Sequence, residues 1–190
     1  MNKKYDYFNI HCWQQPEKAF NIETGKPTYL KILSLFETEY PNARLLDVGC
    51  GNGNFHFLLK ERGYKNVVGI DFSKPSIDMT RKNHPEYEYH VCDVCKTFPF
   101  KDNSFDVVVS ADALEHVISP RLMIGEMLRT VKPSGYCVIR TPNGLRHEFE
   151  VRAYDRGITE SVFQHTTPMI LKWMVTGLGG KVIYINFFAR

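Results

Sequence analysis

Short apolar runs alternate with longer stretches of helical periodicity along the 190-residue chain. The apolar runs lie at residues 44–48, 66–70, 87–92, 105–110, 135–141 and 181–188. The run VVVS at 107–110 is almost entirely apolar, as expected of a strand buried on both faces of a parallel sheet. This alternation is typical of βαβ units, so the sequence predicts an α/β fold with a doubly wound, mostly parallel sheet.

Capping residues mark the expected helices between these runs. One helix is expected over residues 26–39, and a second begins near Asn54 and ends at Gly63, a residue type that stops helices. Three further helices are expected to begin at a Ser or Thr cap with a proline in the first turn: Ser73, Ser119 and Thr167.

Length and composition fit a single globular domain. The chain is 43% hydrophobic and 24% charged, with a formal net charge of +3, all ordinary values for such a domain. We expect one domain over residues 1–190, with three parts: an N-terminal arm (1–25), a ligand-binding core (43–143) and a loop region on the substrate side (144–167).

The stretch LLDVGCGNG (45–53) places three glycines on alternate positions after the first apolar run. Glycine adopts backbone angles closed to larger residues and lets a turn approach a ligand closely. The dinucleotide pattern G-x-G-x-x-G requires glycine where Asn54 stands, and the phosphate-loop pattern does not occur. Asp47, two residues before Gly49, favours a ligand that carries an ammonium or sulfonium cation.

Polar residues also follow the second, third and fourth expected strands: Asp71, Asp93, and Ser110 with Asp112. The carboxyl ends of parallel strands lie along one edge of the sheet, where ligands bind. Asp71 is suited to accept two hydrogen bonds from a ribose diol, and Asp93 to accept one from an adenine amino group. The sequence therefore predicts a site for an adenosine-containing ligand at this edge.

In four successive segments the chain resembles the class I S-adenosylmethionine-dependent methyltransferases, especially the group that includes the ubiquinone-biosynthesis O-methyltransferases. The segments are LLDVGCGNG (45–53), GIDFS (69–73), VCDVCKTFPFKDNSFDVVVSADALEHV (91–117) and LRTVKPSGYCVIRTPN (128–143). The resemblance implies a Rossmann-like methyltransferase fold, S-adenosyl-L-methionine as cofactor and methyl transfer as the activity.

The resemblance also implies that the cofactor lies across the ends of the first four strands, within the core 43–143. The implied residues are Asp47, Gly49, Cys50, Gly51 and Gly53 for the methionine half, Asp71 for the ribose, Phe72, Asp93 and Val94 for the adenine, and Ser110 and Ala111 beneath the sulfonium. Asp47 is expected to hold the amino group of the cofactor, directly or through water.

Asp112, Glu115 and His116 stand at spacings that would share one face of a helix. Some members of the resembling group bind a divalent cation with such an acid-x-x-Glu-His stretch, and His165 is a further candidate ligand. In other relatives the histidine shapes the pocket without a metal. We assign no metal and take His116 as a base or a substrate-positioning residue.

The expected function is methyl transfer to a small-molecule acceptor, at an oxygen atom. One alternative is a methyltransferase acting on RNA ribose 2'-hydroxyls, which the modest charge and the absence of a basic patch argue against. Another is a module that binds the cofactor without turnover. His147 and Tyr154 lie in the stretch where substrate loops are usually found.

Other features of the chain concern its location and partners. No apolar run approaches the roughly 18 residues of a membrane span, and the N-terminus lacks the apolar stretch of a signal peptide, so we expect a cytoplasmic protein without a membrane partner. The five cysteines should be free thiols, and the single pair Cys92 and Cys95 lacks a second pair to complete a zinc site.

The last apolar run, 181–188, raises a question about the edge of the sheet. The resembling enzymes have a seventh, antiparallel strand after the sixth, and the chain stops just after the sixth run. A bare edge strand exposes unpaired backbone groups. An earlier segment or a second molecule could fill this place, so a homodimer through this edge is one expectation.

Overall fold

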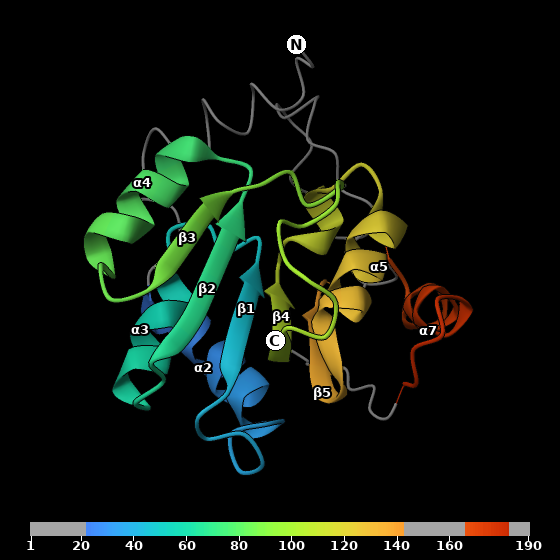
Figure 1. Cartoon of the computed structure of the whole chain (residues 1–190), viewed down its shortest axis with the longest axis horizontal. Helices are drawn as coiled ribbons and strands as arrows, with labels where there is room; N and C mark the ends of the chain where they lie inside the picture. Colours follow the sequence, from blue (N-terminus) through green and yellow to red (C-terminus); the bar gives the residue numbers. More distant parts are fainter. Residues whose placement is uncertain (1–21, 143–165, 183–190) are drawn as a thin grey trace.

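The computed structural model describes residues 22–142 and 166–182, which form a five-stranded sheet with helices on both faces (Figure 1). The strands are β1 (Arg44–Val48), β2 (Asn66–Asp71), β3 (Glu88–Val91), β4 (Phe105–Ala111) and β5 (Val131–Arg140). All neighbours in the order β3-β2-β1-β4-β5 are parallel. The predicted α/β fold with a doubly wound parallel sheet is confirmed, and the described residues contain no antiparallel strand.

Two buried layers sandwich the sheet. One contains side chains of α2 (Ile22–Ser34), α3 (Asn54–Glu61) and α4 (Lys74–Asn83), and the other contains side chains of α5 (Pro120–Thr130) and α7 (Pro168–Gly177). Leu45 belongs to the first layer and its neighbour Leu46 to the second, because successive side chains of a strand point to opposite faces.

The strand order reverses between β1 and β4, which are neighbours at the centre of the sheet. From β1 the chain proceeds outward through β2 to β3, then returns to β4 on the other side of β1. Ligands of open α/β sheets bind outside the carboxyl ends of the strands at such a switch point. The fold therefore predicts a ligand site at the loops after β1 and β4.

Several element boundaries differ from the sequence prediction. Helix α2 runs over Ile22–Ser34 rather than 26–39, so residues 22–25 belong to it and not to an N-terminal arm. Strand β5 begins at Val131 rather than 135, with a register irregularity opposite Phe105 and Val107. Gly135 makes that irregularity possible, because a Cβ there would lie 2.3 Å from the carbonyl oxygen of Asp106.

The expected helix caps are partly confirmed. The side chains of Ser73 and Thr167 accept hydrogen bonds from the amides of Ser76 and Ile170, at 3.4 and 3.2 Å. Ser119 makes no such bond, so α5 begins at Pro120 without a side-chain cap.

Some predictions fall on other parts of the chain. Most of the N-terminal arm, almost all of the loop region 144–167 and the run 183–188 lie outside the described residues, and residues 181–182 are not in a strand. The predicted homodimer edge lies there too. No helix within 22–142 or 166–182 combines the length and the apolar character needed to cross a membrane.

Candidate functional site

The loop between β1 and α3 is a tight turn built on three glycines in the left-handed region: Gly49 (φ 77°), Gly51 (φ 52°) and Gly53 (φ 73°). The amides of Gly49 and Cys50 both donate to the carbonyl of Ile70, at 2.8 and 3.1 Å, which ties the turn to β2. A Cβ at Gly49 would lie 2.4 Å from the Cβ of Ala113, just beyond β4. The turn therefore contacts both neighbours of β1 at the switch point: β2 through hydrogen bonds and the segment after β4 through close packing.

The carboxylate of Asp71, at the end of β2, accepts two backbone hydrogen bonds. The amide of Gly51 donates to Oδ2 at 3.0 Å, and the amide of Ser73 donates to Oδ1 at 2.9 Å. Burial raises the pKa of Asp71 to about 6, and the two amide hydrogen bonds oppose that rise. Because each carboxylate oxygen has a further lone pair, Asp71 retains acceptor capacity for two ribose hydroxyls.

Asp47 on β1 is buried beside a histidine that the sequence analysis did not single out. Nε2 of His56, in α3, lies 3.0 Å from Oδ2 of Asp47, and Nδ1 lies 2.8 Å from the hydroxyl of Tyr89. A signal for His56 was present in the sequence, because it precedes Leu59 by three residues on the face of α3 that turns to the sheet. Its partners could not be read from the sequence, because they depend on how α3 packs.

Tyr29 of α2 was also missed. Burial, with the negative charge of Asp47, raises the pKa of Tyr29 to about 12. Its ring packs on Phe55, with centroids 5.3 Å apart. Helix α2 therefore contributes a phenol to the surroundings of Asp47.

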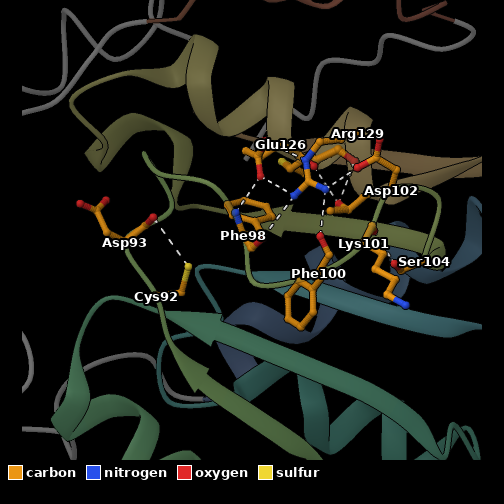
Figure 2. Close-up of polar contacts among 11 residues, drawn as sticks. Cys92, Asp93, Phe98, Phe100, Lys101, Asp102, Ser104, Glu126 and Arg129 are labelled. Carbon is orange, nitrogen blue, oxygen red and sulfur yellow. Dashed lines mark hydrogen bonds and ion pairs between the residues drawn. The ribbon is translucent and has the colours of Figure 1, made fainter.

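The loop after β3 carries Asp93, which Figure 2 shows, and its neighbour Val94. Oδ1 of Asp93 accepts a 3.0 Å hydrogen bond from the amide of Cys95, Oδ2 lies 3.6 Å from Nζ of Lys96, and Val94 is buried. The amide of Cys92 donates to the carbonyl of Asp71 at 2.8 Å, which joins this loop to the end of β2.

Arg129 of α5 holds the far part of the same loop, as Figure 2 shows. Its guanidinium donates to the carbonyl of Phe100 at 2.9 Å, to the carboxylate of Asp102 at 2.7 Å and to that of Glu126 at 2.6 Å. Oε2 of Glu126 in turn accepts from the amide of Phe98 at 2.7 Å. The segment from Cys92 to Ser104, which is neither helix nor strand, is therefore anchored to a helix.

Strand β4 ends at Ser110 and Ala111, next to the glycine loop. Ser110 is fully buried, and its Oγ has no hydrogen-bond partner among the described residues; the same holds for the buried Oδ1 of Asn52 in the glycine loop. Phe72, after β2, is half-buried. Unpartnered buried polar atoms on both sides of the switch point fit a site built to receive a polar ligand.

The segment after β4 corrects one prediction. Asp112, Glu115 and His116 do not share a helix, because only the single 3₁₀ turn Leu114–His116 forms and Asp112 has a positive φ of 56°. Asp112 instead pairs with Arg140 at the end of β5. No cluster of three metal-ligating side chains occurs among residues 22–142 and 166–182. His165, His147 and Tyr154 lie outside these ranges.

Glu115 and His116 do lie side by side. The Glu115 side chain is buried, Oε2 accepts a 3.0 Å hydrogen bond from Oγ1 of Thr141, and Oε1 lies 3.9 Å from Nε2 of His116. Burial raises the pKa of Glu115 to about 7. A carboxyl that titrates near neutrality therefore adjoins an imidazole just beyond β4.

The cysteines of the described residues are free thiols: Cys50, Cys92, Cys95 and Cys137. Cys92 and Cys95 flank the loop residues Asp93 and Val94. Burial raises the pKa of the Cys50 and Cys92 thiols, which disfavours the reactive thiolate.

Fold and site together define a parallel α/β domain whose glycine turn, buried acids and unpartnered polar atoms meet at the switch point of the sheet. Residues 46–139 match the family described as methyltransferase domain. The chain is 30% identical over 167 residues to phosphoethanolamine N-methyltransferase from Triticum aestivum, covering 82% of this chain and 32% of that protein. It is 33% identical over 105 residues to ubiquinone biosynthesis O-methyltransferase from Neisseria meningitidis, covering 53% of this chain and 44% of that protein.

Solved structures agree on the fold. An S-adenosylmethionine-dependent methyltransferase from Mesorhizobium loti superposes with a TM-score of 0.69 at 21% identity, covering 84% of this chain and 82% of that one. The chain belongs to the class I S-adenosylmethionine-dependent methyltransferases, as its four segments predicted, and S-adenosylmethionine is its cofactor. It spans less than half the length of the two curated relatives named above.

Proposed function

We propose that this chain transfers the methyl group of S-adenosylmethionine to an oxygen atom of a small-molecule acceptor, with His116 beside the accepting group. The observation that carries the proposal is the buried Glu115, with a pKa of about 7, lying 3.9 Å from Nε2 of His116. A buried carboxyl with a pKa near neutrality beside an imidazole suits removal of a hydroxyl proton during methyl transfer.

The cofactor takes the place outlined by the strand ends. Its methionine half follows Gly49, Cys50, Gly51 and Gly53 with the amino group at Asp47, its ribose meets Asp71, its adenine meets Phe72, Asp93 and Val94, and its sulfonium lies over Ser110 and Ala111. The contacts described above support this placement, because they hold Asp71 and the glycine turn against each other. The bound cofactor supplies an electrophilic methyl group. The protein holds the acceptor in line with it.

An amine is the second candidate acceptor. The relative from wheat, which covers 82% of this chain, is a phosphoethanolamine N-methyltransferase. An ammonium group must also lose a proton before it can accept a methyl group, so His116 would have the same task.

RNA ribose and a domain without turnover remain as the competing functions. The net charge of +3 gives little attraction for RNA, and affinity for RNA that falls steeply with salt would reverse that preference. We place the protein in the cytoplasm, supported by the free thiols of the described cysteines. We also retain a homodimer through the edge at 181–188 as a proposal.

Calorimetry with S-adenosylhomocysteine, followed by methyl-transfer assays with matched phenols and amines, tests the proposal. His116→Ala should lower kcat about a hundredfold, the scale of general acid–base catalysis, and leave the cofactor affinity within about twofold. His90→Ala, a partly exposed histidine paired with Glu88, is the matched control and should leave both unchanged. Methylation of amines alone would overturn the oxygen acceptor, and full activity of His116→Ala would overturn the role of His116.

A further inference from the structure

We propose that His56 is a positioning residue for the cofactor: it fixes the carboxylate of Asp47 in the orientation that receives the ammonium group. The inference rests on the proposed placement of that ammonium at Asp47. The His56 side chain is fully buried in α3, between Asp47 and Tyr89. It has no direct access to the ligand, so it acts through Asp47.

The sheet register explains how this row of side chains arises. Asp47 in β1 pairs with Gly69 in β2, and Gly69 pairs with Tyr89 in β3, so the three residues form one row across the sheet. Gly69 contributes no side chain, and a Cβ there would lie 2.8 Å from the ring of Tyr89. The ring therefore passes over β2, and His56 of α3 bridges Tyr89 and Asp47.

The available protons set the direction of both hydrogen bonds. An ionised carboxylate can only accept, so Nε2 of His56 carries the proton and donates to Asp47 at 3.0 Å. We take the imidazole as neutral, so that Nδ1 accepts from the Tyr89 hydroxyl at 2.8 Å. Burial raises the pKa of Tyr89, so its hydroxyl keeps the proton that it donates.

This arrangement restrains the Asp47 carboxylate without cancelling its charge. The imidazole is neutral in this scheme, so the net negative charge of the pair remains available to the ammonium. The hydrogen bond to Oδ2 opposes rotation of the carboxylate, so its other oxygen keeps one direction. A preorganised acceptor binds a cation more tightly than one that must be reoriented.

The rival explanation is that His56 only fills space in an aromatic cluster. Its ring centroid lies 5.5 Å from that of Tyr89, 5.8 Å from that of Tyr87 and 5.7 Å from that of His84. A packing role alone would affect every ligand of the site equally. A positioning role would affect only ligands that carry the ammonium group.

Two isosteric variants and two ligands separate these explanations. The amide nitrogen of Gln can take the place of Nε2, whereas the shorter Asn can replace only Nδ1. Binding of S-adenosylhomocysteine, which has the ammonium, and of 5'-methylthioadenosine, which lacks it, is measured by calorimetry. His56→Asn should weaken the binding of S-adenosylhomocysteine about tenfold, as expected for one lost hydrogen bond to a charged group. His56→Gln should restore that binding.

Methylthioadenosine should bind both variants within about twofold of the original protein. Equal weakening of both ligands by His56→Asn, or equal effects of Asn and Gln, would overturn the proposal. Asp47→Asn distinguishes the two levels: if it leaves binding of the homocysteine compound unchanged, the placement of the ammonium at Asp47 is wrong. If Asp47→Asn weakens that binding and His56→Asn does not, only the role of His56 is wrong.

A measurement on the unsubstituted protein covers the case in which the variants do not fold. Nitrogen-15 spectra of the histidine side chains should show His56 as the neutral tautomer protonated at Nε2. The tautomer protonated at Nδ1 would overturn the proposal, because it could not donate to Asp47.

Discussion

The amide of Gly51 donates a 3.0 Å hydrogen bond to Oδ2 of Asp71, so the glycine turn after β1 and the acid after β2 form one structural unit. Oγ1 of Thr80, in α4, donates to the carbonyl of the same glycine at 2.7 Å. Both backbone groups of Gly51, the amide and the carbonyl, are therefore held by side chains of other elements. A change at Asp71 should consequently disturb the glycine turn as well as the end of β2.

Asp71→Asn is expected to weaken S-adenosylhomocysteine binding about a hundredfold. The substitution removes the charge and turns one acceptor into a donor that faces a backbone amide, so two favourable hydrogen bonds are affected. Calorimetry measures the dissociation constant. Asp78→Asn, an exposed acid of α4 paired with Lys74, is the control and should have no effect. Unchanged affinity of Asp71→Asn would exclude Asp71 from the site.

Gly49→Ala should abolish cofactor binding and lower the midpoint of thermal unfolding. The residue has a φ of 77°, and a Cβ would lie 2.4 Å from that of Ala113. Gly63→Ala separates the two causes, since Gly63 has a φ of 79° but no atom within 4 Å of the added carbon. Backbone strain alone costs about 1–3 kcal/mol, so Gly63→Ala should be moderately destabilised and still bind S-adenosylhomocysteine. Loss of binding in both variants would show that global instability is the cause.

Local patterns made the sheet, the glycine turn and Asp71 predictable. A few consecutive residues encode the turn, and a few others encode the acid. A parallel sheet brings the carboxyl ends of its strands to one edge, so the two features are expected to lie near each other. The predicted helical face of Asp112, Glu115 and His116 was wrong, because the spacing alone did not reveal the positive φ of Asp112 or its pairing with Arg140.

Contacts that depend on strand register and helix packing could not be predicted from the sequence. His56 of α3 meets both Asp47 and Tyr89 only because Gly69 of β2 lies between Asp47 in β1 and Tyr89 in β3, a relationship that joins distant segments of the chain. Arg129 likewise meets Phe100 and Asp102 through the placement of α5. No local pattern encodes such contacts, since each partner alone resembles an ordinary polar or aromatic residue.

Arg129→Ala should destabilise the protein by about 2–3 kcal/mol and weaken the binding of S-adenosylhomocysteine. The guanidinium joins two carboxylates and a loop carbonyl, and its loss leaves the partly buried Glu126 without its cationic partner. Urea unfolding gives the free energy, and calorimetry gives the affinity. Lys132→Ala, which breaks an ion pair with Asp106 at the amino end of β4, is the control, with a loss below about 1 kcal/mol and normal affinity. Equal stability of the two variants would contradict the anchoring role of Arg129.

Glu115→Gln should stabilise the protein increasingly as the pH rises. Burial raises the pKa of Glu115 from 4.5 to about 7 in the folded state. Below pH 4.5 both states are protonated, and the group has no net effect. Between these values the unfolded chain releases its proton first, so stability falls as the pH rises, by a total on the order of 3 kcal/mol above pH 7. Glutamine does not titrate, so the variant does not lose this part of the unfolding free energy as the pH rises.

Urea unfolding of both proteins at pH 5, 6, 7 and 8 measures the difference in unfolding free energy. Asp71 titrates in both proteins over part of the same range, so its contribution cancels in the difference. Glu61→Gln, at an exposed position of α3, is the control, and its difference should stay constant with pH. A constant difference for Glu115→Gln as well would mean that Glu115 ionises in the folded protein as easily as in the unfolded chain. It could then not exchange protons near neutrality, and the acid–base pairing with His116 would lose its physical basis.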